Sequence, residues 1–196
     1  MSTITRSVQP TTGPDGPISI DQYEKLVETG VLTKRDKVQL IDGMLVPKMV
    51  QNPPHSVANV LCGGALTRII PADWHVRAAM PVRLPPKSEP EPDHCVVRGT
   101  ARDYLQRHPE PKDVGLLVEV ADKTRQAANQ KMTRKYGANG IPVYWIVNLV
   151  DNQVEVYTNP TADGYGPARI YKPGENVPVM LDRTVVGHIA VSDILP

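Results

Sequence analysis

Two almost uninterrupted apolar runs limit what this 196-residue chain can fold into. One is DVGLLVEV at residues 113–120, and the other is IPVYWIVNLV at residues 141–150. Strands with so few polar side chains are typical of a sheet that is covered on both faces, since neither face suits water. The segment between them, residues 124–140, has the pattern of a helix that ends at Gly140. These runs predict a mixed α/β sheet flanked by helices.

Shorter patterns supply the other elements of this sheet. Residues 19–30, with Gly30 as the stop, and residues 55–70 are predicted to be helices. The Asp42-Gly43 pair between two β-rich runs is a strong hairpin signal and predicts an N-terminal hairpin. Residues 167–196 are expected to form three short strands.

Pro-rich and polar segments set the expected boundaries of the domain. Residues 1–17 are rich in Pro, Gly and Thr and are predicted to be a flexible N-terminal tail. Residues 18–196 are expected to form a single domain. Within it, PPKSEPEP at residues 85–92 is predicted to be an exposed loop, and residues 101–109 have helical character.

The composition excludes some classes of protein. The formal net charge of +1 gives no global field to attract nucleic acid, so DNA binding would depend on local basic patches. No stretch approaches the roughly 18 apolar residues of a membrane span, and the N-terminal segment lacks the apolar core of a signal peptide. Cys62 and Cys95 have neither metal-ligand spacing nor a disulfide framework. We therefore expect buried free thiols in a reducing cytoplasm.

Two acidic residues stand where apolar strands would not favour them. Asp93 precedes the strand-like run HCVV, and Glu119 interrupts the buried run LLVEV. An ionised carboxylate in such a strand needs a partner, because burying its charge alone costs several kcal/mol. Glu119 could pair with a Lys or Arg at the end of its strand. Alternatively, it faces Asp93 across neighbouring strands, and a divalent cation such as Mg²⁺ relieves the repulsion between the two carboxylates.

A basic helix follows the second acid. Lys131 and Lys135 are four residues apart and thus neighbours on one helical face. A cation beside a metal site can orient an attacking water molecule and neutralise charge that develops on a phosphate. The alternative is a solvated helix face, which accounts for most such runs of lysine.

The motifs EPDHCVVRG, LLVEVAD and GIPVYWIVN, in this order, resemble the Uma-type putative restriction endonuclease family, a bacterial branch of the PD-(D/E)xK nuclease superfamily. The similarity extends over roughly residues 20–196 and includes the upstream motifs VQLIDGMLV and NPPHSV. It implies a restriction-endonuclease-like fold with the active site at one edge of a mixed central sheet. It also implies that Asp93 and Glu119 bind Mg²⁺ or Mn²⁺, and that a lysine on the following helix assists them.

The chain departs from the family pattern at two positions. Relative to Tyr136, the helix lysine of the family would fall on Met132, so Lys131 is the first candidate for its role and Lys135 the second. The hairpin glutamate of the family is replaced by Gln39, whose amide oxygen would coordinate a metal more weakly. His55 matches a family position and is a possible supporting residue, although a histidine at a helix start can also bond locally.

The resulting hypothesis is a cytoplasmic, Mg²⁺-dependent endonuclease that hydrolyses DNA, acts as a homodimer and has no membrane segment. One alternative is a catalytically impaired nuclease-fold protein that binds nucleic acid or another protein. A weaker one is a structural domain that works only as a dimer. No base-reading motif separates DNA from RNA or fixes a target sequence. Four basic residues could line a nucleic-acid groove, although scattered surface bases are the default expectation: Arg68, Arg77, Arg83 and Lys87.

Overall fold

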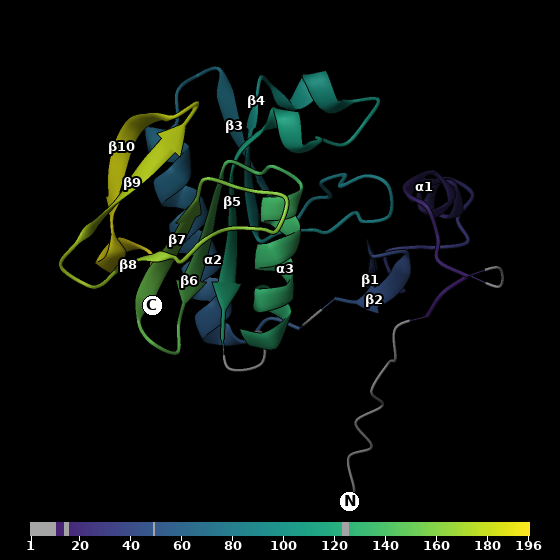
Figure 1. The fold of residues 1–196 in the computed structure, drawn as a ribbon, viewed down its shortest axis with the longest axis horizontal. Helices are drawn as coiled ribbons and strands as arrows, with labels where there is room; N and C mark the ends of the chain where they lie inside the picture. The colour runs from purple at the N-terminus through teal and green to yellow at the C-terminus, as the bar shows by residue number, and fades with distance from the viewer. Residues whose placement is uncertain (1–10, 14–15, 49, 123–125) are drawn as a thin grey trace, which may run out of the picture. The chain divides into compact units, whose positions relative to one another are not determined.

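The computed structural model describes residues 11–13, 16–48, 50–122 and 126–196. The chain divides into two compact units, and each is treated separately below. The first comprises residues 1–50 and 83–91, and the second comprises residues 51–82 and 92–196. Figure 1 shows the ribbon coloured by residue number.

The first unit contains one helix and one hairpin: α1 (Ile20–Glu28), β1 (Val38–Ile41) and β2 (Met44–Pro47). The side chain of Ser19 accepts a hydrogen bond from the Gln22 backbone N–H, and the Gln22 side chain accepts one in return, which forms a capping box at the start of α1. Asp42 and Gly43 form the hairpin turn with φ of 53° and 75°. Both predictions from the sequence, the helix and the hairpin, are confirmed.

The predicted exposed loop at residues 85–92 is wrong for its second half. Ser88, Glu89 and Pro90 are buried, because the Glu89 backbone N–H donates to the Leu40 carbonyl at 2.7 Å and so pairs with β1. A polar composition does not prevent burial when a neighbouring strand offers unpaired backbone groups. The predicted tail falls outside the described residues at 1–10 and 14–15, while Thr11 pairs with Leu45 of β2.

The second unit is built on one six-stranded sheet in the order β3-β4-β5-β6-β7-β8. Only β5 and β6 are parallel, and the other neighbours in this sheet are antiparallel. The strands are β3 (Trp74–Ala78), β4 (His94–Arg98), β5 (Val114–Ala121), β6 (Val143–Asn148), β7 (Gln153–Thr158) and β8 (Arg169–Tyr171). Every residue of β5 and β6 is buried, as the apolar runs predict.

Helices and a hairpin cover the two faces of this sheet (Figure 1). Helix α3 (Gln126–Ala138) joins β5 to β6 and packs on one face. Helix α2 (Pro53–Ile69) and the hairpin of β9 (Asn176–Leu181) and β10 (Thr184–Ala190) pack on the other. Thus the mixed α/β sheet flanked by helices is confirmed.

Close packing between α2 and β4 depends on a glycine. A Cβ atom at Gly63 would lie 2.8 Å from Cε1 of His94, whose Nε2 donates to the Asn59 carbonyl at 2.9 Å. Glycine therefore weakens the helix on its own but allows the imidazole ring to pack against the helix backbone. His94 consequently points to the α2 face.

Three smaller points complete the description. The helical character of residues 101–109 is realised only as a 3₁₀ turn, η1 (Ala101–Tyr104), so the prediction of a longer helix is wrong. Two more 3₁₀ turns are η2 (Pro111–Asp113) and η3 (Val191–Asp193). Cys62 and Cys95 are buried and free, as expected. Across the described parts of the chain, we find no helix long and apolar enough to span a membrane.

Candidate active site

The pairing of β4 with β5 brings the two predicted acids together. His94 lies opposite Val118 and Cys95 lies opposite Leu117, so the antiparallel register continued by one residue places Asp93 opposite Glu119. Backbone positions directly opposite each other in an antiparallel pair are about 4.5–5.5 Å apart. Residues separated by more than twenty positions in the sequence therefore meet at the point where β4 begins and β5 ends.

Asp93 is fixed by hydrogen bonds on both carboxylate oxygens. Its Oδ2 accepts from the Val120 backbone N–H at 2.9 Å, and its Oδ1 lies 3.2 Å from Nε2 of His55 and 3.4 Å from Nε2 of Gln51. Only 4% of Asp93 is exposed. The carboxylate accepts from the backbone of β5 at the residue just before β4 begins, so a side chain extends the hydrogen bonding of the sheet.

His55 reaches Asp93 because α2 begins beside it. The Asn52 side-chain oxygen accepts from the His55 backbone N–H at 3.0 Å and caps the helix, and two prolines occupy its first positions. The amide nitrogen of Asn52 donates to Oδ2 of Asp122 at 2.7 Å. One asparagine therefore connects the start of α2 to the end of β5. The supporting position predicted for His55 is thus in contact with Asp93, whereas its role in the reaction stays a prediction.

Three residues of this region were not predicted as part of the site. Gln51 and Asn52 precede the prolines of α2, and the Asn-Pro-Pro signal indicates a helix start but not what the helix start would touch. Asp122 was expected to cap the helix after β5. In the structure it is buried and accepts from Asn52, while residues 123–125, where that cap would form, lie outside the described residues.

Glu119 receives a hydrogen bond from the helix on its face of the sheet. The hydroxyl of Tyr136 on α3 donates to Oε1 of Glu119 at 3.0 Å, and Tyr136 is fully buried. Burial is the main cause that raises the pKa of Tyr136 well above its usual value, and the charge of Glu119 adds to this. The same two causes raise the pKa of Tyr144 beneath it. The tyrosine therefore remains a hydrogen-bond donor to the carboxylate across the working pH range.

The predicted lysines lie on other sides of α3 than Tyr136. Successive residues of an α-helix are rotated by about 100°, which places Met132 about 40°, Lys135 about 100° and Lys131 about 140° from Tyr136. Lys131 is exposed and Lys135 is half-buried. Of these three residues, Met132 therefore lies nearest to the side of α3 that carries Tyr136. The catalytic roles of both lysines stay predictions.

Gln39 belongs to the first unit, where it lies on β1. Its side-chain oxygen accepts from the Glu91 backbone N–H at 3.0 Å. The amide is thus used to hold the segment that leads into Asp93. Its supporting role at the metal site stays a prediction.

A family model described as Uma2, "Putative restriction endonuclease", matches residues 20–185. The chain belongs to the Uma2 family. The chain also resembles a protein from Anabaena variabilis whose crystal structure is titled as that of a putative nuclease belonging to DUF820. The two share 16% sequence identity with a TM-score of 0.70, over 91% of this chain and 97% of the other. No curated protein matches the chain. The family recognised from its motifs is thereby confirmed, and the structural likeness supports the nuclease fold.

The acids of the Uma2 protein suit a hard divalent cation. Among the described residues, no group of three or more His, Cys, Asp or Glu side chains forms a closed metal cage. A pair of carboxylates is nonetheless a familiar donor set for Mg²⁺, which keeps several water molecules and often takes its remaining ligands from a phosphate. Asp93 and Glu119 are buried oxygen donors on neighbouring strands, which is the kind of ligand that such an ion takes.

Proposed function

We propose that this Uma2 protein is a metal-dependent endonuclease that hydrolyses phosphodiester bonds in DNA. The observation that carries the proposal is the β4–β5 register, which, continued one residue beyond the pair of His94 and Val118, puts the backbone of Asp93 opposite that of Glu119. Both acids are buried. Buried carboxylates need compensation, and a phosphodiesterase needs a cation where its substrate phosphate binds. Family membership supports the same class of activity.

Each residue has a distinct role in this proposal. Asp93 and Glu119 hold Mg²⁺ or Mn²⁺, which when bound lowers the pKa of a water molecule and stabilises the leaving oxygen. His55 and the Val120 backbone N–H keep the Asp93 carboxylate oriented. Tyr136 does the same for Glu119.

Basic side chains complete the site in this proposal. Lys131, or Lys135 in its place, approaches the phosphate from α3 and neutralises charge that develops there. The protein acts in the cytoplasm as a homodimer, since one active site on each copy would allow both strands of a duplex to be cut.

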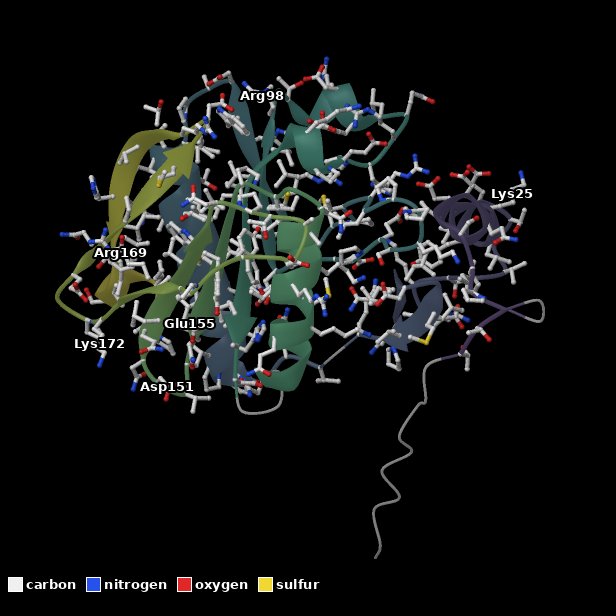
Figure 2. The ribbon with its side chains drawn as sticks, viewed as in Figure 1. Lys25, Arg98, Asp151, Glu155, Arg169 and Lys172 are labelled. Atoms are coloured by element: carbon white, nitrogen blue, oxygen red, sulfur yellow. The ribbon has the colours of Figure 1, made fainter. Side chains whose placement is uncertain are left out.

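The test is cleavage of a supercoiled plasmid in Mg²⁺ or Mn²⁺ by the wild type, Asp93→Asn and Glu119→Gln. Loss of a metal ligand should lower the rate by more than about 100-fold, because loss of a residue that merely orients a ligand already costs about 10–100-fold. Glu155→Gln is a matched control. Glu155 lies on β7 opposite Ile146, which in turn lies opposite Glu119, so it is an acid in the same cross-strand row but two strands away (Figure 2). Cleavage that persists in both site variants would contradict the assignment.

A catalytically impaired protein that binds nucleic acid or another protein is the second candidate. It is favoured by Met132, which occupies the family's lysine position on the side of α3 nearest to Tyr136, and by Gln39 in place of glutamate. Titration calorimetry with Mn²⁺ separates the two candidates. An endonuclease should show a heat of binding that Asp93→Asn removes, whereas DNA binding without such a heat favours the binding protein.

A further inference from the structure

Arg77 on β3 is a buried cation without an acidic partner. Only 9% of the residue is exposed, and its Nε atom is shielded from solvent with no hydrogen-bond acceptor. No carboxylate among the described residues forms an ion pair with it. Burial lowers the pKa of Arg77, and the groups that oppose this shift are Cys95 and Tyr104. Both are neutral near pH 7, because burial raises the pKa of each.

An uncompensated guanidinium at this depth is energetically unfavourable. Burying an ion costs several kcal/mol unless a partner of opposite charge and further hydrogen bonds offset the loss of water. Arginine does not escape this cost by losing its proton, because the guanidinium stays protonated in proteins near neutral pH. The fold therefore keeps a charge that the described residues leave without a counter-ion, and an anion from outside would supply one.

The guanidinium is held in place by an aromatic ring. Cζ of Arg77 lies 5.6 Å from the ring centroid of Tyr104, within the range of a cation–π contact. Arg107 lies 5.2 Å from the same centroid, but Asp113 binds Arg107 through two hydrogen bonds of 2.5 and 3.1 Å. Arg107 and Asp113 therefore neutralise each other, and the positive charge that remains at this ring belongs to Arg77.

The position of Arg77 on the sheet relates it to the candidate active site. Arg77 lies opposite Cys95, and Cys95 lies opposite Leu117, so strand alternation puts Arg77 on the face that Glu119 also uses. The backbone of Arg77 lies roughly 8 Å from that of Asp93, because the two residues are separated by one strand spacing and by two residues along the strand. Tyr104 donates to the carbonyl of Arg98 at the far end of β4, so the guanidinium leans away from Asp93. β3 is also one of the two edge strands of its sheet.

We propose that Arg77, held against Tyr104, binds a backbone phosphate of the nucleic-acid substrate that flanks the phosphate at Asp93 and Glu119. This inference rests on the proposed nuclease function and adds a substrate-binding subsite to it. Arginine suits the task because its planar fork donates two parallel hydrogen bonds to phosphate oxygens. A phosphate would at the same time supply the acceptor and the negative charge that the protein lacks there.

The experiment is binding of a fluorescein-labelled DNA duplex to the full chain in EDTA, followed by fluorescence anisotropy over a series of salt concentrations. Each phosphate contact contributes about 0.9 to the slope of log K against log salt. Arg77→Gln should lower the steepness of this slope by about 0.9 and weaken binding about tenfold. Arg77→Lys should keep the slope and weaken binding several-fold, because an ammonium group lacks the two-pronged geometry.

Arg169→Gln is the matched control. Arg169 also lies over a tyrosine, at 4.9 Å from the Tyr171 centroid, but it is exposed on β8 at the opposite edge of the sheet (Figure 2). Its loss should leave the slope unchanged. Thermal unfolding of each variant, with and without millimolar inorganic phosphate, reports on folding and on binding of a free anion. Phosphate should raise the Tm of the wild type more than that of Arg77→Gln.

Several outcomes would overturn the inference. An unchanged salt slope in Arg77→Gln with a lowered Tm would show that Arg77 only fastens η1 to β3. A phosphate-dependent Tm with an unchanged DNA slope would assign Arg77 to a free anion. If Arg77→Gln does not fold, the Arg77→Lys variant provides the test. A DNA affinity of Arg77→Lys equal to that of the wild type would reject the two-pronged contact. If the wild type cleaves DNA and binds metal through Asp93 but fails these tests, only the subsite is rejected. If the wild type binds no DNA, both proposals are rejected.

Discussion

Removal of the Tyr136 hydroxyl tests whether α3 holds a metal ligand in place. Tyr136→Phe deletes one oxygen atom, which donates to Oε1 of Glu119 at 3.0 Å, and leaves the aromatic ring. That ring packs against Tyr144 with the centroids 5.0 Å apart, so the buried apolar contact is retained. The variant therefore isolates one hydrogen bond to one carboxylate.

The expected effect has a stability part and a metal-binding part. A hydrogen bond to a charged group contributes about 1.5–3 kcal/mol, and Glu119 is only 9% exposed, so water does not readily replace the lost donor. The free energy of unfolding without metal should fall by about that amount. A carboxylate freed from its orienting partner should also bind Mn²⁺ about 10–100-fold more weakly.

Urea unfolding in EDTA and Mn²⁺ titration calorimetry measure the two parts. Tyr165→Phe is the control, because Tyr165 belongs to the same aromatic cluster but donates to the Ile141 carbonyl at 2.6 Å rather than to Glu119. It should lose stability and keep its Kd for Mn²⁺. A Tyr136→Phe protein with wild-type Mn²⁺ affinity, under conditions where Asp93→Asn abolishes binding, would refute the idea that Tyr136 positions Glu119.

Two further predictions concern stability. Gly63→Ala should destabilise the fold by about 1–3 kcal/mol, since its Cβ would lie 2.8 Å from the His94 ring. Gly64→Ala, with 3.6 Å to its nearest neighbour, should be neutral or stabilising by up to about 1 kcal/mol, and Tm values compare the pair. Burial first, and the charge of Glu24 second, raise the pKa of Glu89 from 4.5 to about 8. The folded form then keeps a proton that the unfolded form loses, so the free energy of unfolding should fall by a few kcal/mol as the pH rises from about 4.5 to about 8. Urea titrations should show this fall in the wild type and little of it in Glu89→Gln.

The sequence predicts the central sheet well because the relevant signals are local. The apolar runs around Glu119 and Trp145 form strands whose every residue is buried, and Asp42-Gly43 forms the expected turn. Local signals do not reveal which segments meet. Residues 88–90 are polar or proline and still become buried, because the edge of β1 that does not pair with β2 offers backbone hydrogen-bonding groups beside them.

The residues of the candidate site also divide into those that local sequence signals reveal and those that they do not. Asp93 and Glu119 could be singled out because a carboxylate next to an apolar strand is anomalous in the sequence itself. Asn52 and Gln51 could not, since an Asn before two prolines indicates only where a helix begins. Their contacts with Asp122 and Asp93 depend on where α2 starts relative to β4 and β5, which is a property of the assembled unit.

Placement of Asp93 depends on how its neighbour His94 packs. Alternate residues of a strand point to opposite faces, so the orientation of the chain at the start of β4 is set by the side chain of His94, which packs against the middle of α2. His94 fits there because Gly63 has no side chain and because the Asn59 carbonyl accepts from Nε2. The pairing also contains an irregularity between Val96 and Val97, so the register near Asp93 is fixed by its own end of the strand. A side chain at position 63 should therefore weaken Mn²⁺ binding as well as stability, although position 63 makes no contact with the acids themselves.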